Sequence, residues 1–466
     1  MPRKLRFAFL IVVVVLAVPA ATAHAVARMP VGFFDDPSFR WSPDAGKNLA
    51  SAQSANGSII HILVNWASVA PTRPANPLNG NDPAYHLSDI DAMVQTAPKY
   101  GLQVLLTIAL TPPWANGGKT PNYPPKNLND LTQFSQMLAT RYNGSKAGRG
   151  VVTRFSVWNE PNLQLFLAPQ FSGSKIVSPG IYAKLFMAAY KGIKAGNKNA
   201  LVAAGETSNR GHNHPTSPSS SDSVAPATFA RLVSEANPKL PLDAWATHPY
   251  PTAYRLGPNQ RVAYPNVGFS TMDKFGADLQ KWFKKAVPIW VTEYGEQTAP
   301  YPYGPVSYAQ QAAHAKQALQ LAAKSPYVQM FIWFILRDSN AQTWFSGLQT
   351  VSGKKKPSFN AFKSTAAGIV GQSQVVAPGK TFSVKVPLPI LAASNSAGTK
   401  VGMTYKVYLG KTVQYVSQPL LPLAKDGTVT IKVNFRPVKG KTYTMTVNAN
   451  DKTARMEQQN ILLLPS

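Results

Sequence analysis

Residues 128–158 read LNDLTQFSQMLATRYNGSKAGRGVVTRFSVW, which joins a helical pattern to a β-like run. In the first half, apolar residues recur at the spacing of one helix face, and Gly144 marks the expected end. The last five residues form a short run of the kind that a buried strand uses. We therefore interpret this stretch as one helix followed by one strand of a larger repeat.

The same alternation extends in both directions, from Val31 to about Gly347. Eight predicted strands cover residues 31–34, 59–64, 103–108, 154–158, 201–204, 244–247, 289–292 and 329–334. Six predicted helices cover residues 87–100, 128–142, 181–195, 227–236, 271–285 and 308–324. Eight strands alternating with helices predict an α/β fold, a (β/α)8 TIM barrel. A doubly wound open sheet is the alternative, but no Gly-rich phosphate turn follows the first strand.

A different pattern begins at about residue 371. Apolar and polar residues alternate in the runs 382–386, 405–408, 429–433 and 443–447, and glycines separate these runs. This alternation predicts a small all-β, sandwich-like domain. We thus divide the chain into a signal peptide (1–27), a barrel (28–370) and an accessory domain (371–466). For the accessory domain, packing or spacing is favoured over carbohydrate binding.

The first 27 residues have the pattern of a secretory leader. Arg3, Lys4 and Arg6 precede an apolar run over residues 7–18, and two Ala-x-Ala sites follow within residues 23–27. This pattern indicates a signal peptide, with an uncleaved anchor as the alternative. No later run approaches the ~20 apolar residues of a spanning helix. We expect an extracellular protein that leaves the membrane once the signal peptide is cleaved, either free or associated with the cell wall.

The chain is strongly basic, with a formal net charge of +27. The excess is spread along the chain: from Ser373 onward alone, twelve Lys or Arg stand against three Asp or Glu. Such a surface favours anionic cell-wall polymers as partners. Nucleic-acid binding is not predicted, because the sequence has no basic run interleaved with aromatic residues. The chain has no cysteine, so core burial must stabilise a secreted fold. We predict a monomer without a cofactor. A metal site is not predicted either, because the seven histidines lack the spacing of metal ligands.

Two acidic motifs follow predicted strands directly. The fourth strand runs into Trp158-Asn159-Glu160-Pro161, and the seventh ends in Thr292-Glu293. A carboxylate that closes an apolar strand is costly to desolvate unless function keeps it there. Strands four and seven lie across a barrel mouth from each other, so both side chains are expected to reach one site.

Cleavage of a glycosidic bond needs two such carboxyl groups, one protonated and one ionised. Side chains that approach to ~5 Å support a retaining mechanism, whereas ~6.5–9.5 Å is typical of inversion. We predict Glu160 as the acid/base, with a raised pKa, and Glu293 as an ionised nucleophile. Glu206, just after strand five, is a third carboxylate that either reaches the substrate or orders a loop.

These motifs resemble those of clan A glycoside hydrolases, and the ending Gly347-Leu348 to Lys356-Pro357 resembles family 39 in particular, with family 5 cellulase-like enzymes as relatives. The resemblance covers about residues 30–365 and implies hydrolysis of a β-linked poly- or oligosaccharide. It implies that Asn159 holds the sugar 2-hydroxyl, that His248 or Tyr250 contacts the nucleophile, and that Trp333 lies under the sugar ring. The remaining predicted substrate-binding residues are Asn65, Trp114 and Tyr294.

The sequence departs from the clan near the second strand, where many members place an arginine. Asn65, Trp66 and Arg73 are the candidates for that role. Pro112-Pro113-Trp114 follows the third strand in place of the histidine of several families. Two other functions remain open: an inactive barrel that binds polysaccharide, and a basic adhesion protein held by charge alone. His314, in the Ala-rich helix 308–324, is expected on a helix surface.

Overall fold

The computed structural model describes residues 29–465 apart from short gaps. The gaps are residues 101, 146–148, 368, 370–371, 393–394, 410–411, 440, 442 and 453–455. The predicted signal peptide, residues 1–27, lies outside the described residues. Within the described part, every helix is too short or too polar to span a bilayer.

Eight parallel strands close into a barrel, in the order β1-β10-β9-β8-β7-β4-β3-β2. Their bounds are β1 Val31–Phe34, β2 Ile59–Asn65, β3 Gln103–Ala109, β4 Arg154–Val157, β7 Leu201–Ser208, β8 Ala244–His248, β9 Ile289–Val291 and β10 Val328–Phe334. Each matches a predicted strand to within a few residues. The predicted (β/α)8 barrel is therefore confirmed.

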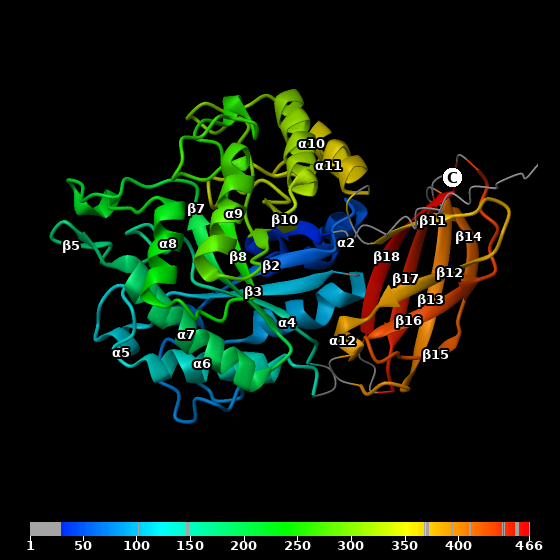
Figure 1. Ribbon diagram of the computed structural model, residues 1–466, viewed down its shortest axis with the longest axis horizontal. Helices are drawn as coiled ribbons and strands as arrows, with labels where there is room; N and C mark the ends of the chain where they lie inside the picture. The colour runs from blue at the N-terminus through cyan, green and yellow to red at the C-terminus, as the bar shows by residue number, and fades with distance from the viewer. Residues whose placement is uncertain are drawn as a thin grey trace, which may run out of the picture.

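Helices surround the barrel, and the predicted six are all present (Figure 1). They are α4 Ser88–Thr96 with the 3-10 turn η1 Ala97–Tyr100, α6 Leu128–Arg141, α7 Ser178–Gly196, α8 Pro226–Ala236, α9 Met272–Phe283 and α10 Tyr308–Lys324. Two further long helices were not predicted, α2 Ala45–Ser54 and α11 Pro357–Ala367. Short elements fill the connections: α1 Asp36–Phe39, α3 Trp66–Val69, α5 Pro113–Asn116, η2 Ser219–Ser221, η3 Tyr254–Leu256, η4 Phe269–Thr271 and the hairpin of β5 Phe171–Ser172 with β6 Lys175–Ile176.

The barrel has two apolar layers, as parallel strands covered by helices require. Its interior is filled by small and medium side chains such as Leu105, Ala203, Ala246 and Met330. The larger layer lies between strands and helices. There α6 and α7 pack so closely that a Cβ at Gly192 would lie 2.1 Å from the Thr132 carbonyl oxygen. The rigid double layer fixes where each strand ends.

Strand β7 is irregular near its carboxyl end. The pairing with β8 shifts between Ala204 and Thr207, and the two residues between them, Gly205 and Glu206, have φ of 102° and 48°. Such a bulge re-aims the side chains that it carries. The predicted strand ended at residue 204, because Gly205 and Glu206 interrupt the apolar run in the sequence.

The C-terminal sheets lie beside the barrel, and β18 lies against η1 (Figure 1). Their strands are β11 Gln372–Val376, β12 Phe382–Pro387, β13 Lys400–Leu409, β14 Thr412–Ser417, β15 Leu420–Pro422, β16 Thr428–Val433, β17 Tyr443–Asn450 and β18 Met456–Pro465, with the short helix α12 Pro389–Ala392. Alternate residues, such as Val384, Val407, Ile431 and Val447, form their core. The pairings are antiparallel as predicted, except that β11 runs parallel to β18.

Candidate active site

A cleft of about 660 Å³ opens at the carboxyl ends of the barrel strands. Two carboxylates line it, Glu160 and Glu293, together with Asn159 and Tyr250. Its walls are largely aromatic, formed by Phe34, Phe166, Tyr254, Tyr301, Tyr303, Phe334 and Trp344. The cleft thus combines paired acids with flat apolar surfaces, which suits a ligand with both hydroxyl groups and C–H faces.

Glu160 is held by an unusual backbone at the end of β4. Trp158 and Glu160 both have positive φ, 73° and 39°, a region that non-glycine residues rarely occupy. The Trp158 ring is buried and donates a hydrogen bond to the Phe166 carbonyl oxygen at 2.7 Å. The Glu160 N–H donates to the Glu206 carbonyl oxygen at 2.8 Å. Trp158 is therefore an anchor, and the turn that it starts directs Glu160 into the cleft.

Glu293 follows β9 and lies deeper than Glu160, with 11% of its side chain exposed against 17%. The Tyr250 hydroxyl donates to Glu293 Oε2 at 3.0 Å. His248 Nδ1 lies 3.0 Å from Glu160 Oε1 and 3.7 Å from Glu293 Oε2. Because both oxygens lie so close to one nitrogen, they are at most 6.7 Å apart, the sum of the two distances.

A third carboxylate lies beneath this pair. Glu206 is fully buried and its Oε2 accepts hydrogen bonds from His248 Nε2 at 2.8 Å and from Thr292 Oγ1 at 2.6 Å. It does not line the cleft. The Glu206 side chain therefore lies outside the cleft, while its main-chain carbonyl oxygen bonds the turn that carries Glu160.

Burial and the neighbouring charges shift the titration of the whole cluster. Burial raises the pKa of Glu293 to about 7, although the His248 charge and the Tyr250 hydroxyl oppose the rise. Burial lowers the pKa of His248, but the carboxylates of Glu293, Glu160 and Glu206 outweigh it and hold that pKa well above its ordinary value. Burial also opposes ionisation of Glu206, and its bond to His248 outweighs this and lowers its pKa. Burial thus raises the pKa of Glu293, which the sequence reasoning expected to be an ionised nucleophile.

Four predicted substrate-binding residues lie away from the cleft. Trp333 is fully buried between strand and helices, where its indole donates to the Ser346 carbonyl oxygen. Tyr294 is buried beside it and its hydroxyl donates to Glu296. Both were expected at the sugar, and the prediction was wrong because their side chains point out of the barrel.

Asn65 and Trp114 also have other tasks. The Asn65 side chain caps α3 by accepting from the Ser68 N–H at 3.2 Å. The Trp114 indole donates to the Ala70 carbonyl oxygen at 2.7 Å, and its ring packs edge-on against Trp66. Neither Asn65, a candidate for the role of the clan arginine, nor Trp114 lines the cleft.

Arg73 is likewise engaged elsewhere, in an ion pair with Asp130. His314 was expected on a helix surface, but its Nδ1 bonds the buried carboxylate of Glu296. His248, Tyr250 and Asn159 do lie at the predicted site, with His248 behind the acids and not on the cleft wall.

Several cleft residues were missed from the sequence. Phe34 and Phe334, the last residues of β1 and β10, line the cleft but were not singled out. Their position at the ends of predicted strands is the sequence feature that could have identified them. Tyr301 and Tyr303 belong to a Pro- and Tyr-rich tract after β9, which indicated a loop on the active side but not which of its residues face inward.

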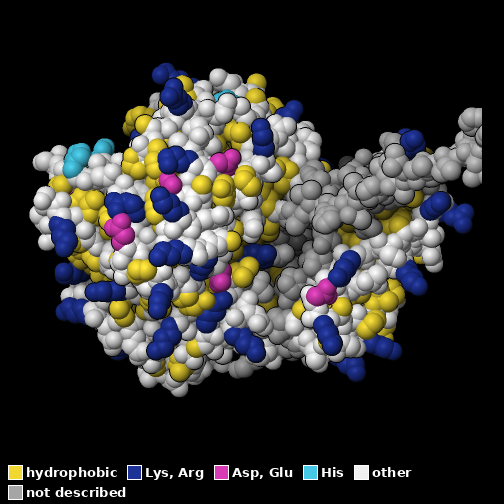
Figure 2. Space-filling model, in the orientation of Figure 1, with side chains coloured by type: hydrophobic (Ala, Val, Ile, Leu, Met, Phe, Trp, Pro, Cys, Tyr) yellow, Lys and Arg dark blue, Asp and Glu magenta, His cyan; other side chains and the backbone are white. Residues whose placement is uncertain are grey.

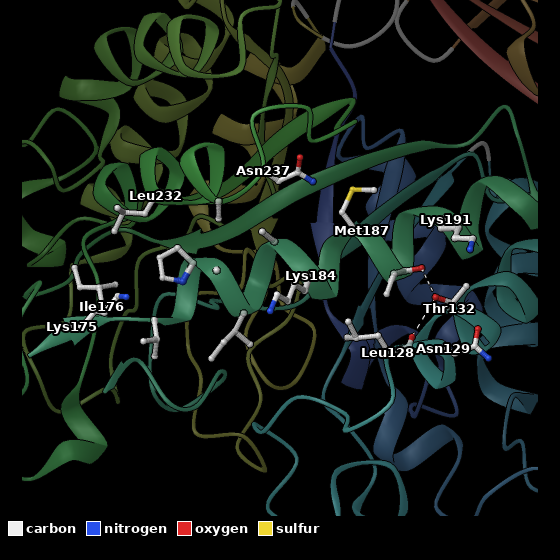
Figure 3. A pocket seen from close by; sticks show the side chains of 17 residues that line it. Leu128, Asn129, Thr132, Lys175, Ile176, Lys184, Met187, Lys191, Leu232 and Asn237 are labelled. Atoms are coloured by element: carbon white, nitrogen blue, oxygen red, sulfur yellow. Dashed lines mark hydrogen bonds between the residues drawn. The ribbon is translucent and has the colours of Figure 1, made fainter. Parts of the chain in front are cut away.

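A larger hollow of about 970 Å³ lies on the outside of the barrel, between α6, α7 and α8. Figure 3 shows Lys184, Met187 and Lys191 of α7 and Leu232 of α8 around it. Its described lining holds lysines and apolar groups but no carboxylate. It therefore cannot supply the paired acids that the barrel mouth provides.

Comparison with known proteins agrees with this geometry. Residues 228–361 match the family model described as the glycosyl hydrolase catalytic core. No curated protein matched the chain at the level set for significance.

The barrel fold recurs in solved glycoside hydrolases. A family 39 enzyme from the gut symbiont Bacteroides cellulosilyticus WH2 is similar with TM-score 0.54 at 16% identity, over 87% of this chain and 79% of that one. A GH5_18 enzyme from Streptomyces cattleya gives 0.52 at 15%, over 76% and 85%. Native xylanase 10B from Thermotoga maritima gives 0.50 at 16%, over 73% and 95%. The chain therefore matches the glycosyl hydrolase catalytic core over residues 228–361 and shares the eight-stranded barrel fold of these enzymes.

Proposed function

We propose that this chain is a secreted retaining glycoside hydrolase that cleaves β-linked poly- or oligosaccharides. The observation that carries the proposal is the pair Glu160 and Glu293, whose nearest oxygens are at most 6.7 Å apart across the cleft. Carboxyl groups about 5–5.5 Å apart serve retention, and most inverting pairs are wider, at about 6.5–9.5 Å. The upper limit therefore favours the double-displacement reaction.

In the first step, a Glu293 oxygen attacks the anomeric carbon while the bond to the leaving oxygen breaks. The proton of Glu160 passes to that oxygen, so the leaving group departs as a neutral alcohol. The products are a glycosyl ester on Glu293 and a carboxylate at Glu160. In the second step, Glu160 takes a proton from water, whose oxygen displaces Glu293 and releases the sugar with its original configuration.

The neighbouring groups fit these steps. The Tyr250 hydroxyl donates to Glu293 Oε2, so it stabilises that carboxylate before attack and again as it leaves. Asn159 lines the cleft beside Glu160, where its amide can bond a sugar hydroxyl next to the anomeric carbon. The aromatic walls, including Phe334 and Trp344, suit the C–H faces of pyranose rings.

We further propose that the enzyme prefers glycans that carry negative charge, such as anionic cell-wall polymers. Arg210 is the one basic residue among the described residues that line the cleft. Its backbone is fixed, because its carbonyl oxygen accepts from Asn162 and Ser208. Figure 2 shows Lys and Arg spread over the visible faces of the barrel and the C-terminal sheets, which favours encounter with a polyanion.

The proposal includes a monomeric state and secretion, and secretion rests on the basic and apolar leader of residues 1–27. Expression with this leader in a secreting bacterial host should yield extracellular protein that lacks the leader. Its intact mass would locate the cleavage site, and protein that stays in the membrane fraction would contradict cleavage.

Turnover of aryl β-glycosides tests the catalytic roles. Glu160→Gln and Glu293→Gln should each lower kcat by at least about 100-fold, the scale of acid–base and nucleophilic catalysis. Glu235→Gln, an exposed carboxylate on α8 paired with Arg231, is the matched control and should leave kcat unchanged. Azide should restore turnover to Glu160→Ala and yield a β-glycosyl azide, because the azide anion, unlike water, attacks the glycosyl ester without a general base.

Unchanged activity in either glutamine variant would refute the assigned pair. A wild-type chain that retards polysaccharide in affinity electrophoresis but releases no reducing ends would instead support the inactive binding barrel. Product lengths from a panel of neutral and acidic polysaccharides would then identify the sugar and separate exo from endo cleavage.

A further inference from the structure

A buried chain of charged groups connects Glu206 to the cleft. Glu206 accepts from His248 Nε2, and His248 Nδ1 faces Glu160 at 3.0 Å and Glu293 at 3.7 Å. The side chains of Glu206 and His248 are both fully buried. Glu206 therefore touches no substrate, and any effect that it has on the reaction must pass through His248.

The backbone holds this connection rigidly. Glu206 lies in the bulge of β7 with φ of 48°, and its carbonyl oxygen accepts from the Glu160 N–H at 2.8 Å. A residue stays in this region only where its surroundings enforce it. Glu206 thus fixes Glu160 by its main chain and His248 by its side chain.

The contacts of His248 define its protonation. Both ring nitrogens face carboxylate oxygens, and a carboxylate can only accept hydrogen bonds. A neutral imidazole would turn a lone pair toward one of these anions. An imidazolium donates from both nitrogens and satisfies both oxygens, whether Glu160 is ionised or carries its proton on the other oxygen, so the geometry favours the doubly protonated ring.

We infer that Glu206 is a positioning residue for the reaction, which keeps His248 as an imidazolium shared by Glu160 and Glu293. This inference rests on the proposed function. With Nδ1–H donating to Glu160 Oε1, the acidic proton of Glu160 must sit on its other oxygen. A neutral His248 would instead accept that proton and withhold it from the leaving oxygen.

The shared cation also follows the charge during the reaction. Before attack the negative charge is on Glu293, and after glycosyl transfer it is on Glu160, because Glu293 has become an ester. His248 Nδ1 lies 3.0 Å from the Glu160 oxygen and 3.7 Å from the Glu293 oxygen, so its positive charge is close to whichever of them is ionised. Glu206 keeps the cation in place through both steps.

Few other ionisable groups face His248 within the described residues. Besides Glu160, Glu206 and Glu293, His61 on β2 interacts with it, and burial lowers the pKa of His61 to about 4, so His61 stays neutral. The Tyr250 hydroxyl faces Glu293, and burial raises its pKa well above 10. The charge on His248 therefore depends mainly on the three carboxylates.

The test is Glu206→Gln, which keeps the size and an accepting oxygen for Thr292 and His248 but removes the charge. Loss of a nearby opposite charge lowers a histidine pKa by about 1–3 units. We expect the alkaline limb of the kcat/KM profile to move to lower pH by at least one unit, because His248 then loses its proton earlier. Glu296→Gln is the matched control, a buried glutamate bonded to His314 and Tyr294 and outside the cleft. It should leave the limb unmoved.

Imidazole nitrogen NMR on histidine-labelled protein gives a readout independent of activity. The chain has seven histidines, so the His248 signals can be assigned with His248→Gln. In the wild-type protein His248 should be doubly protonated at pH 7, and in Glu206→Gln the ring should lose its second proton at a pH at least about one unit lower than in the wild type. If Glu206→Gln does not fold, the wild-type titration alone decides, since a neutral His248 at pH 7 overturns the inference. An unmoved alkaline limb in folded Glu206→Gln also overturns it, whereas activity retained in Glu160→Gln or Glu293→Gln refutes the proposed function itself.

Discussion

Tyr250→Phe removes a single hydroxyl from the candidate site and leaves the ring in place. That hydroxyl donates to Glu293 Oε2 at 3.0 Å, and Glu293 has only 11% of its side chain exposed. Burial raises the Tyr250 pKa well above its ordinary value, so the hydroxyl keeps its proton throughout the accessible pH range. The variant therefore tests one hydrogen bond to one carboxylate.

The expected size of the effect follows from that bond. A hydrogen bond to a charged group contributes about 1.5–3 kcal/mol, and one pKa unit corresponds to about 1.36 kcal/mol. The Tyr250 bond favours the ionised form and opposes the burial that raises the Glu293 pKa to about 7. Its removal should raise this pKa by a further ~1–2 units. Because Glu293 must be ionised to attack, the acid limb of the rate profile should move to higher pH by that amount.

The assay is kcat/KM for an aryl β-glycoside between pH 4 and pH 9. Below the limb the loss of rate in Tyr250→Phe should reach about 10- to 100-fold, and it should shrink as the pH rises. Tyr85→Phe is the control, since the Tyr85 hydroxyl donates to the Pro77 carbonyl oxygen outside the cleft. An acid limb that stays in place in Tyr250→Phe, with an equal loss at every pH, would refute the assigned role of this bond.

Two further predictions concern charge. Arg210→Gln should raise KM for an aryl β-glucuronide by about 10-fold or more and leave KM for the neutral aryl β-glucoside unchanged, because only the acidic sugar loses a charge-assisted bond; equal changes for both substrates would exclude Arg210 from substrate choice. Lys356→Met should lower the free energy of unfolding by about 3–5 kcal/mol in urea titration, because it leaves the buried Asp338 carboxylate without its cation. Lys385→Met, in the exposed pair with Asp426, should leave that free energy unchanged, and a similar loss in both variants would contradict the reasoning.

The barrel was predictable because its strands are buried on both faces. Parallel strands covered by helices give short apolar runs, and the helices between them repeat at a different period. The strand ends were less predictable where the backbone deviates. At Gly205 and Glu206 the bulge interrupts the apolar run, so the last residues of β7 were not expected.

The same double burial explains why the predicted aromatic contacts failed. On β10, Phe331 and Trp333 pack outward with the helices, while Ile332 joins the interior and Phe334 reaches the cleft. All four residues are apolar, so the sequence does not reveal which parity faces inward. The prediction chose Trp333, and the structure places Phe334 in the cleft.

Carboxylates at strand ends were easier to find, because burying a charge needs a specific partner. That rule singled out Glu160 and Glu293 as a pair and Glu206 as a third candidate, since each follows a predicted strand. Only the geometry separates them. Two of these side chains line the cleft, while the third points beneath it to His248 and Thr292. Glu206, the carboxylate outside the cleft, is also the one that lies in the bulge of β7. The bulge turns its side chain away from the substrate and toward His248, which contacts Glu160 and Glu293. The role of Glu206 therefore follows from its backbone conformation.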